Sequence, residues 1–229
     1  MSIILKQPIT GPAAWTGKDI QNETHWIEQL QAADIRTLDD ALAALRAKGL
    51  TFPNFQREDF PISSALAKRL NMLAEELENG RGFALWRGLP VHRYSEEELK
   101  SVYYGIGLHL GKPVCQNPRG DLLGEVAAVG DPQDIRTRVY QTNLYLPYHS
   151  DPSDVVGLLC VRKAKQGGVS SLVSVARIYN EILTKHPEYL GLFYRLFYFE
   201  HLCEPEPSLS PIFSYHKGKL LSLIHISEP

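Results

Sequence analysis

Two residues with metal-binding side chains stand two positions apart in the chain, His149 and Asp151, in the stretch Tyr148-His-Ser-Asp. In a strand both side chains would project to the same face, because side chains alternate with period two. One imidazole and one carboxylate are two of the three ligands of the facial triad that holds non-heme Fe(II). The pair therefore predicts a catalytic iron site. The surrounding turn formers, His-Ser-Asp-Pro-Ser-Asp, leave an ordinary surface turn as the alternative.

Two further patterns follow this pair. The first is the apolar run Val155-Val-Gly-Leu-Leu-Cys-Val, which is typical of a buried strand. The second is Gly167-Gly-Val-Ser, in which two glycines favour a turn that presents the hydroxyl of Ser170. The iron site would thus lie at the edge of a sheet, and its third ligand, a second His, is expected much further along the chain.

The elements that must position these residues change in type along the sequence. Apolar spacing and capping signals predict helices at residues 37–49, 66–79, 95–111 and 174–186. Short alternating or apolar segments predict strands at residues 83–87, 125–129, 139–146, 155–163 and 170–174. Strand-rich sequence with one helical insertion favours a jelly-roll pair of sheets, although the spacing alone establishes only mixed α and β structure.

Several segments together resemble the TauD/TfdA (taurine dioxygenase-like) family of oxygenases. The matching segments are Gly82-Phe-Ala-Leu-Trp-Arg-Gly-Leu-Pro, Thr142-Asn, Tyr148-His-Ser-Asp-Pro, Gly157-Leu-Leu-Cys, Gly167-Gly-Val-Ser-Ser-Leu-Val-Ser and the hairpin-like Pro211-Ile-Phe-Ser-Tyr-His-Lys-Gly-Lys-Leu. A His-x-Asp triplet alone is common. The order His-x-Asp, apolar strand, Gly-Gly-x-Ser is considerably more specific.

The resemblance implies an α+β fold, a double-stranded β-helix (jelly roll) with flanking helices. It also implies a dioxygenase, an oxidoreductase that uses Fe(II) and 2-oxoglutarate to oxidise a small organic substrate with O2, releasing succinate and CO2. His149 and Asp151 would bind the iron. The hydroxyl of Ser170 would help to hold the distal carboxylate of 2-oxoglutarate, and Asn143 would lie near this co-substrate. A carboxylate at Asp151, where related halogenases carry a small residue, indicates hydroxylation or desaturation.

The last nine residues depart from the family pattern. Leu221-Ser-Leu-Ile-His-Ile-Ser-Glu-Pro looks like the translation of an adapter used in sequencing libraries, although its alternation would also suit a strand. The chain is therefore expected to consist of a helical and linker extension (1–60), the first part of the oxygenase domain (61–220) and a non-native tail (221–229). The family's second His and its co-substrate Arg would lie beyond, so we expect the domain to be incomplete and this chain itself inactive.

Composition excludes several function classes. With 229 residues, 44% of them hydrophobic, and a net charge of −2, the chain can bury one core and shows no electrostatic affinity for nucleic acid or an anionic membrane. The N-terminus resembles no signal peptide, and three widely spaced cysteines favour reduced thiols. We expect a cytoplasmic or mitochondrial protein whose partners are a small-molecule substrate and O2, with an oligomeric state that the sequence does not fix.

Two alternatives to the 2-oxoglutarate-dependent enzyme stay open at this point. A cupin-like oxygenase would use iron without 2-oxoglutarate, and an inactive fragment would lack a complete metal site. Two other histidines, His201 and His216, could complete the triad if the fold differs from the inferred one.

Overall fold

The computed structural model describes residues 4–117, 119–130, 133, 137, 142–151, 153–199 and 206–222. The chain divides into two compact units. Unit 1 comprises Met1–Gly17, Gly124–Asp154 and Val169–Pro229, and unit 2 comprises Lys18–Leu123 and Val155–Gly168. The domain boundaries expected from the sequence stay a prediction.

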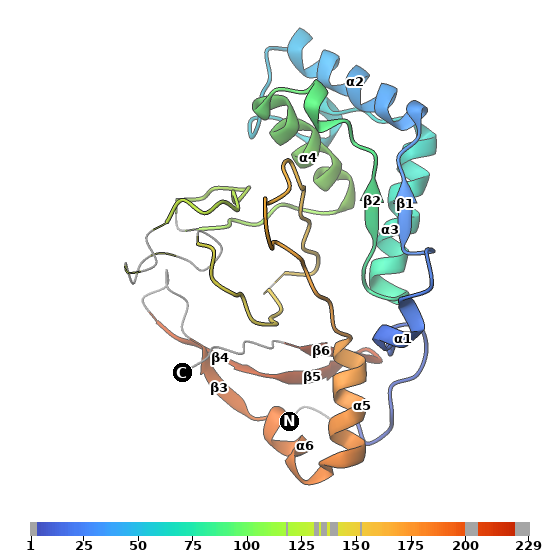
Figure 1. Cartoon of the computed structure of the whole chain (residues 1–229), viewed down its shortest axis with the longest axis vertical. Coiled ribbons are helices and arrows are strands. Elements are labelled where there is room, and N and C mark those ends of the chain that lie inside the picture. Colours follow the sequence, from blue (N-terminus) through green and yellow to red (C-terminus); the bar gives the residue numbers. More distant parts are fainter. Residues whose placement is uncertain are drawn as a thin grey trace. The chain divides into compact units, whose positions relative to one another are not determined.

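The described residues form helices, short 3₁₀ turns and three two-stranded sheets (Figure 1). The helices are α1 (Gly17–Ile20), α2 (Ala32–Ala47), α3 (Ser64–Asn79), α4 (Glu96–Leu110), α5 (Val175–Lys185) and α6 (Pro187–Phe193), with 3₁₀ helices η1 (Arg57–Asp59) and η2 (Val91–Arg93). The strands are β1 (Ile27–Gln29), β2 (Leu85–Arg87), β3 (Leu196–Phe199), β4 (Ser208–Pro211), β5 (Phe213–His216) and β6 (Lys219–Ser222). The expected α+β class is confirmed. In the described part, no helix has the length and apolar character needed to cross a bilayer.

Unit 2 is built around helices α2, α3 and α4, which share one apolar core. The parallel strands β1 and β2 pair with Ile27 opposite Leu85, and helix α3 lies beside them (Figure 1). Aromatic rings from the connection between α2 and α3 fill the centre, with Phe55 stacked on Phe60 at 6.0 Å between ring centroids. The largest fully buried side chains of this unit are Leu38, Leu45, Phe55, Phe60, Leu66, Leu70 and Val102.

Helix α2 begins earlier than the sequence predicts. Its N-cap is Gln31, whose backbone N–H donates to Asp34 Oδ2 at 2.8 Å, so the expected cap, Thr37, lies inside the helix. The same carboxylate accepts a hydrogen bond from Arg69 of α3, and this long-range ion pair fixes the first turn. One predicted boundary is confirmed, the capping box that Ser95 forms with Glu98 at the start of α4. Helix α3 begins two residues before the predicted start, with Ser63 as its N-cap.

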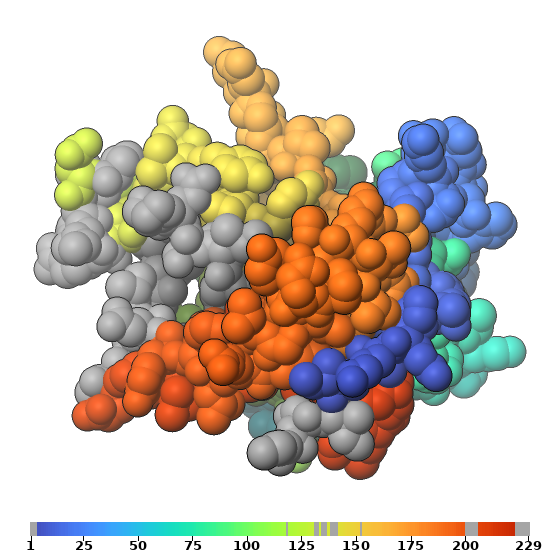
Figure 2. All heavy atoms as spheres, turned by 90° about the horizontal axis from the view of Figure 1, so that it is seen from below, coloured from blue at the N-terminus to red at the C-terminus, as the bar shows by residue number. Residues whose placement is uncertain are grey.

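Unit 1 contains α5, α6 and the hairpins β3–β4 and β5–β6. Its core is the fully buried pair Tyr179 and Phe213 with Leu190. Figure 2 shows the N-terminal residues, in blue, lying against the orange helices of this unit. The hairpin predicted near residues 211–220 is confirmed: β5 and β6 pair with Phe213 opposite Ser222. Its turn residues Lys217 and Gly218 both adopt positive φ, 48° and 82°.

The strands predicted between residues 125 and 174 are wrong for the described residues. Those described between Gly111 and Val173 form no helix and no strand, and residues 139–141 lie outside the description. A strand needs a partner for its backbone N–H and C=O groups. No strand pairing extends along the described residues of this segment, and the apolar run expected to be buried is instead exposed, with Val155 at 50% and Leu158 at 76%. The described structure therefore contains no double-stranded β-helix.

Candidate metal centre

His149 and Asp151 lie close together in an irregular segment of unit 1. The Nε2 atom of His149 is 3.9 Å from Oδ1 of Asp151, and their side chains are 31% and 46% exposed. The strand that was expected to place them on one face is absent from the described structure here, so the loop itself turns the two side chains toward one another. The sequence predicted the pairing, although it gave the wrong local structure as the cause.

A backbone carbonyl orients the imidazole. His149 Nδ1 lies 2.8 Å from the carbonyl oxygen of Pro147, which can only accept. In the neutral imidazole the proton is therefore on Nδ1 and the lone pair on Nε2, which is the tautomer that binds a metal through Nε2. A hydrogen bond on the distal nitrogen is the usual support for a metal-binding His. The sequence did not identify this partner, because a backbone carbonyl leaves no residue-type signature.

The donor set fits a divalent first-row metal such as Fe(II). Metal–ligand bonds of about 2.1 Å meeting at a right angle separate two ligand atoms by roughly 3 Å. The observed 3.9 Å between Nε2 and Oδ1 is about 1 Å longer, a gap that a rotation of the half-exposed Asp151 side chain would close. The pair supplies one nitrogen and one oxygen ligand, so a complete triad needs one more donor.

The middle residue of the triplet joins this segment to the last strand. Ser150 Oγ donates to the carbonyl oxygen of Ser222 at 3.2 Å, so His149 and Asp151 flank an anchored residue. Ser222 belongs to the nine-residue tail that the sequence predicts to be foreign. That assignment stays a prediction; β6 includes Leu221 and Ser222, and residues 223–229 lie outside the description.

Ser170 and Asn143, the candidate co-substrate residues, also belong to unit 1 and are exposed. Asn143 lies at the centre of a small turn in which Leu144 N donates to Thr142 Oγ1 at 3.1 Å. Ser170 follows Gly167 and Gly168, whose φ angles of 73° and 69° lie in the region that glycine adopts readily; the predicted turn itself is not assigned at these residues. Their proposed roles at the co-substrate stay predictions.

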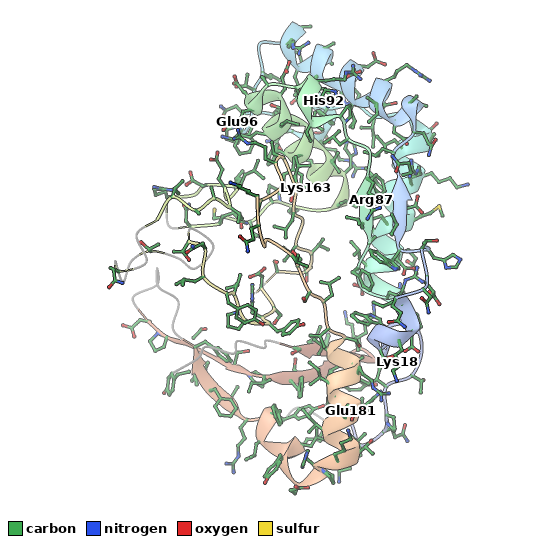
Figure 3. All side chains as sticks on the ribbon, in the orientation of Figure 1. Lys18, Arg87, His92, Glu96, Lys163 and Glu181 are labelled. Carbon is green, nitrogen blue, oxygen red and sulfur yellow. The ribbon has the colours of Figure 1, made fainter. Side chains whose placement is uncertain are left out.

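The third ligand is not found among the described residues. No group of three His, Cys, Asp or Glu side chains within them could hold a metal ion. His216 is exposed at the end of β5, and His92 is exposed in η2 (Figure 3). His201 lies outside the described residues.

Comparison with known proteins decides the family. The model of the family described as "Taurine catabolism dioxygenase TauD, TfdA family" matches residues 46–228. The chain belongs to the TauD/TfdA family. This family consists of Fe(II)- and 2-oxoglutarate-dependent dioxygenases, in agreement with the resemblance found in the sequence.

Two curated relatives align with nearly the whole chain. The FR-33289 synthase of Streptomyces rubellomurinus is 35% identical over 224 residues, which cover 95% of this chain and 66% of the relative. The taurine hydroxylase-like protein SAT17 of Stachybotrys chartarum is 26% identical over 222 residues, which cover 91% of this chain and 56% of the relative. The chain thus spans between about half and two thirds of the length of these two TauD/TfdA relatives.

Proposed function

We propose that the whole protein is an Fe(II)- and 2-oxoglutarate-dependent dioxygenase that hydroxylates a small organic substrate and releases succinate and CO2. The observation that carries this proposal is the His149–Asp151 pair, with Nε2 and Oδ1 3.9 Å apart and the imidazole in its metal-binding tautomer. Family membership supplies the reaction class. Hydroxylation is preferred to desaturation because one relative is named a hydroxylase-like protein.

Each candidate residue has a distinct part in this proposal. His149 and Asp151 hold the metal, and the Pro147 carbonyl keeps the imidazole of His149 oriented. Ser170 donates one hydrogen bond to the distal carboxylate of 2-oxoglutarate, whose main charge partner would be an Arg. Asn143 lies beside the co-substrate. When bound, iron with 2-oxoglutarate supplies the oxidation of a C–H bond by O2; the protein orients the reactants.

The fold of the whole catalytic domain is part of the proposal. A double-stranded β-helix would pair the segments at residues 125–129, 139–146, 155–163 and 170–174, whose apolar side chains are largely exposed in the described structure. The second His and the Arg are proposed to come from residues outside those described. We further propose a cytoplasmic enzyme whose partners are its substrate and O2, with no nucleic acid and no membrane, in keeping with its net charge of −2.

The test measures succinate release and O2 uptake by the whole protein with Fe(II) and 2-oxoglutarate. One succinate for each 2-oxoglutarate consumed, dependent on iron and lost in Asp151→Ala, supports the proposal. O2 uptake with iron but without 2-oxoglutarate would instead identify a cupin-like oxygenase. The variant His92→Ala is the matched control, since this exposed His of η2 lies outside the candidate site.

A further inference from the structure

Residues 5–13, here called the N-terminal strap, lie against helices α5 and α6 in unit 1 (Figure 2). Two apolar side chains of the strap, Leu5 and Ile9, pack on the core cluster around Tyr179, Leu190 and Phe213. The residues between them point to solvent. The helices therefore contact the strap, which bends at Gln7, through two apolar side chains four residues apart.

The centre of the strap is held by one side-chain amide. The backbone N–H of Ile9 donates to Asn180 Oδ1 at 2.7 Å, and Asn180 Nδ2 donates to the carbonyl oxygen of Ile9 at 2.7 Å. Asn180 thus satisfies both backbone groups of one residue, as a neighbouring strand would do in a sheet. This pairing recognises extended backbone and is indifferent to the side chain that the backbone carries.

Hydroxyl groups hold the two ends of the strap. At Leu5, the backbone N–H donates to Tyr194 Oη at 3.3 Å, the two tyrosine hydroxyls lie 2.8 Å apart, and Tyr179 Oη donates to the Leu5 carbonyl oxygen. These bonds close a ring in which each hydroxyl donates once and accepts once. At the other end, Ser174 Oγ donates to the carbonyl oxygen of Ala13 at 2.5 Å.

We propose that this face of α5 and α6 is a peptide-binding surface, and that the strap is its intramolecular ligand, exchangeable for the same segment supplied in trans. The preferred peptide carries two apolar side chains four residues apart, at the positions of Leu5 and Ile9. The hydrogen bonds go to the backbone of both of these residues and to that of Ala13, so the surface recognises peptide groups as well as the two apolar side chains. This proposal does not depend on the dioxygenase activity.

The first experiment titrates a fluorescent peptide of residues 4–14 into three full-length chains. The chain with Ile9→Asp, whose own strap cannot bury an aspartate, should bind the peptide with 1:1 stoichiometry, and the unaltered chain should bind it at least tenfold more weakly. Adding Asn180→Ala to Ile9→Asp should cost about tenfold in affinity, about 1.4 kcal/mol. Equal binding by the unaltered and Ile9→Asp chains, or no binding by the latter, would overturn the proposal.

The matched control is Thr184→Ala on the Ile9→Asp background, since Thr184 is exposed on the same helix, α5. It should leave peptide affinity unchanged; a loss equal to that of Asn180→Ala would remove the role given to Asn180.

A second measurement uses the chain with its strap intact and serves if Ile9→Asp does not fold. Amide hydrogen exchange at Ile9 should be slow in the unaltered chain and at least tenfold faster in Asn180→Ala, while Thr184→Ala leaves it unchanged. Exchange at Ile9 in the unaltered chain as fast as in the isolated peptide would show that the strap is not bound, and would end the proposal.

Discussion

Gly105 of α4 lies directly against the ring of Phe60: a Cβ atom at this position would be 2.5 Å from Cδ1 of the phenylalanine. Both residues are buried in the core of unit 2. The absence of a side chain at Gly105 is what allows the α2–α3 connection to pack its aromatic ring on α4.

Gly105→Ala should therefore destabilise the protein, by about 1–3 kcal/mol, because the added methyl overpacks the core. Gly107, in the same helix, has no atom within 4 Å of a Cβ position, and Gly107→Ala should stabilise by about 0.5–1 kcal/mol through the unfolded state. Urea unfolding of both variants is the measurement. Equal effects of the two substitutions would contradict the packing seen here.

Metal binding should require both members of the candidate pair. His149→Ala and Asp151→Ala should each reduce Fe(II) affinity by more than the roughly 10–100-fold that loss of an outer-shell partner costs, since each removes a direct ligand. Cobalt(II) absorption reports binding separately from turnover. His92→Ala should leave the spectrum unchanged, and an Asp151→Ala protein with full 2-oxoglutarate turnover would refute the assignment.

The described part of the chain supplies two ligands, so iron affinity of this chain alone should be weak and its turnover of 2-oxoglutarate low. His216→Ala should not weaken iron binding further, because His216 lies at the exposed end of β5. Calorimetric titration of both chains with Fe(II) under argon makes the comparison. Tight binding that is lost in His216→Ala would mean that this residue is the third ligand.

Ser170 should affect the co-substrate and not the metal. One hydrogen bond to a charged carboxylate contributes roughly 1.5–3 kcal/mol, so Ser170→Ala should weaken 2-oxoglutarate binding about ten- to a hundredfold. The neighbouring exposed Ser171→Ala is the matched control. Titration of 2-oxoglutarate into both variants of the whole protein is the measurement, and unchanged affinity in Ser170→Ala would leave Ser170 as an ordinary turn residue.

Tyr94 gives unit 2 a pH dependence at the alkaline end. Burial, with the hydrogen bond from Tyr94 Oη to Asp39 at 2.7 Å, raises the pKa of Tyr94 from 10.0 to about 12. The folded state thus retains a proton that the unfolded chain releases. The contribution of Tyr94 to the free energy of unfolding is therefore complete below pH 10 and is lost as the pH rises toward 12. Unfolding free energies at pH 9, 10 and 11 should fall less steeply in Tyr94→Phe; parallel pH profiles would contradict this.

The sequence predicted local structure well where the signal is short-range. The capping residues Ser95 and Ser174 each act within four residues of the chain, and each was found in its expected place. Thr37 was misassigned because a distant residue, Arg69, stabilises an earlier start of α2. Such a long-range ion pair has no local pattern.

At the candidate site, too, short-range features could be predicted from the sequence and long-range features could not. The closeness of His149 and Asp151 was predicted from their spacing, but the irregular segment around them, and not a strand, brings the two side chains together. The support from the Pro147 carbonyl and the exposure of residues 155–161 depend on backbone geometry and on strand pairing across the chain. Neither is encoded in the residue types of the segment itself.

Apart from the side chains of Leu5 and Ile9, the strap is held through its peptide groups, which has an evolutionary consequence. Substitutions at Lys6 or Gln7 leave every hydrogen bond of Asn180, Tyr179 and Tyr194 intact. Selection on the strap should therefore act on Leu5 and Ile9, while the residues between them accumulate substitutions. Homologues that keep Asn180 can diverge at their N-termini and still fasten the same segment to the same two helices.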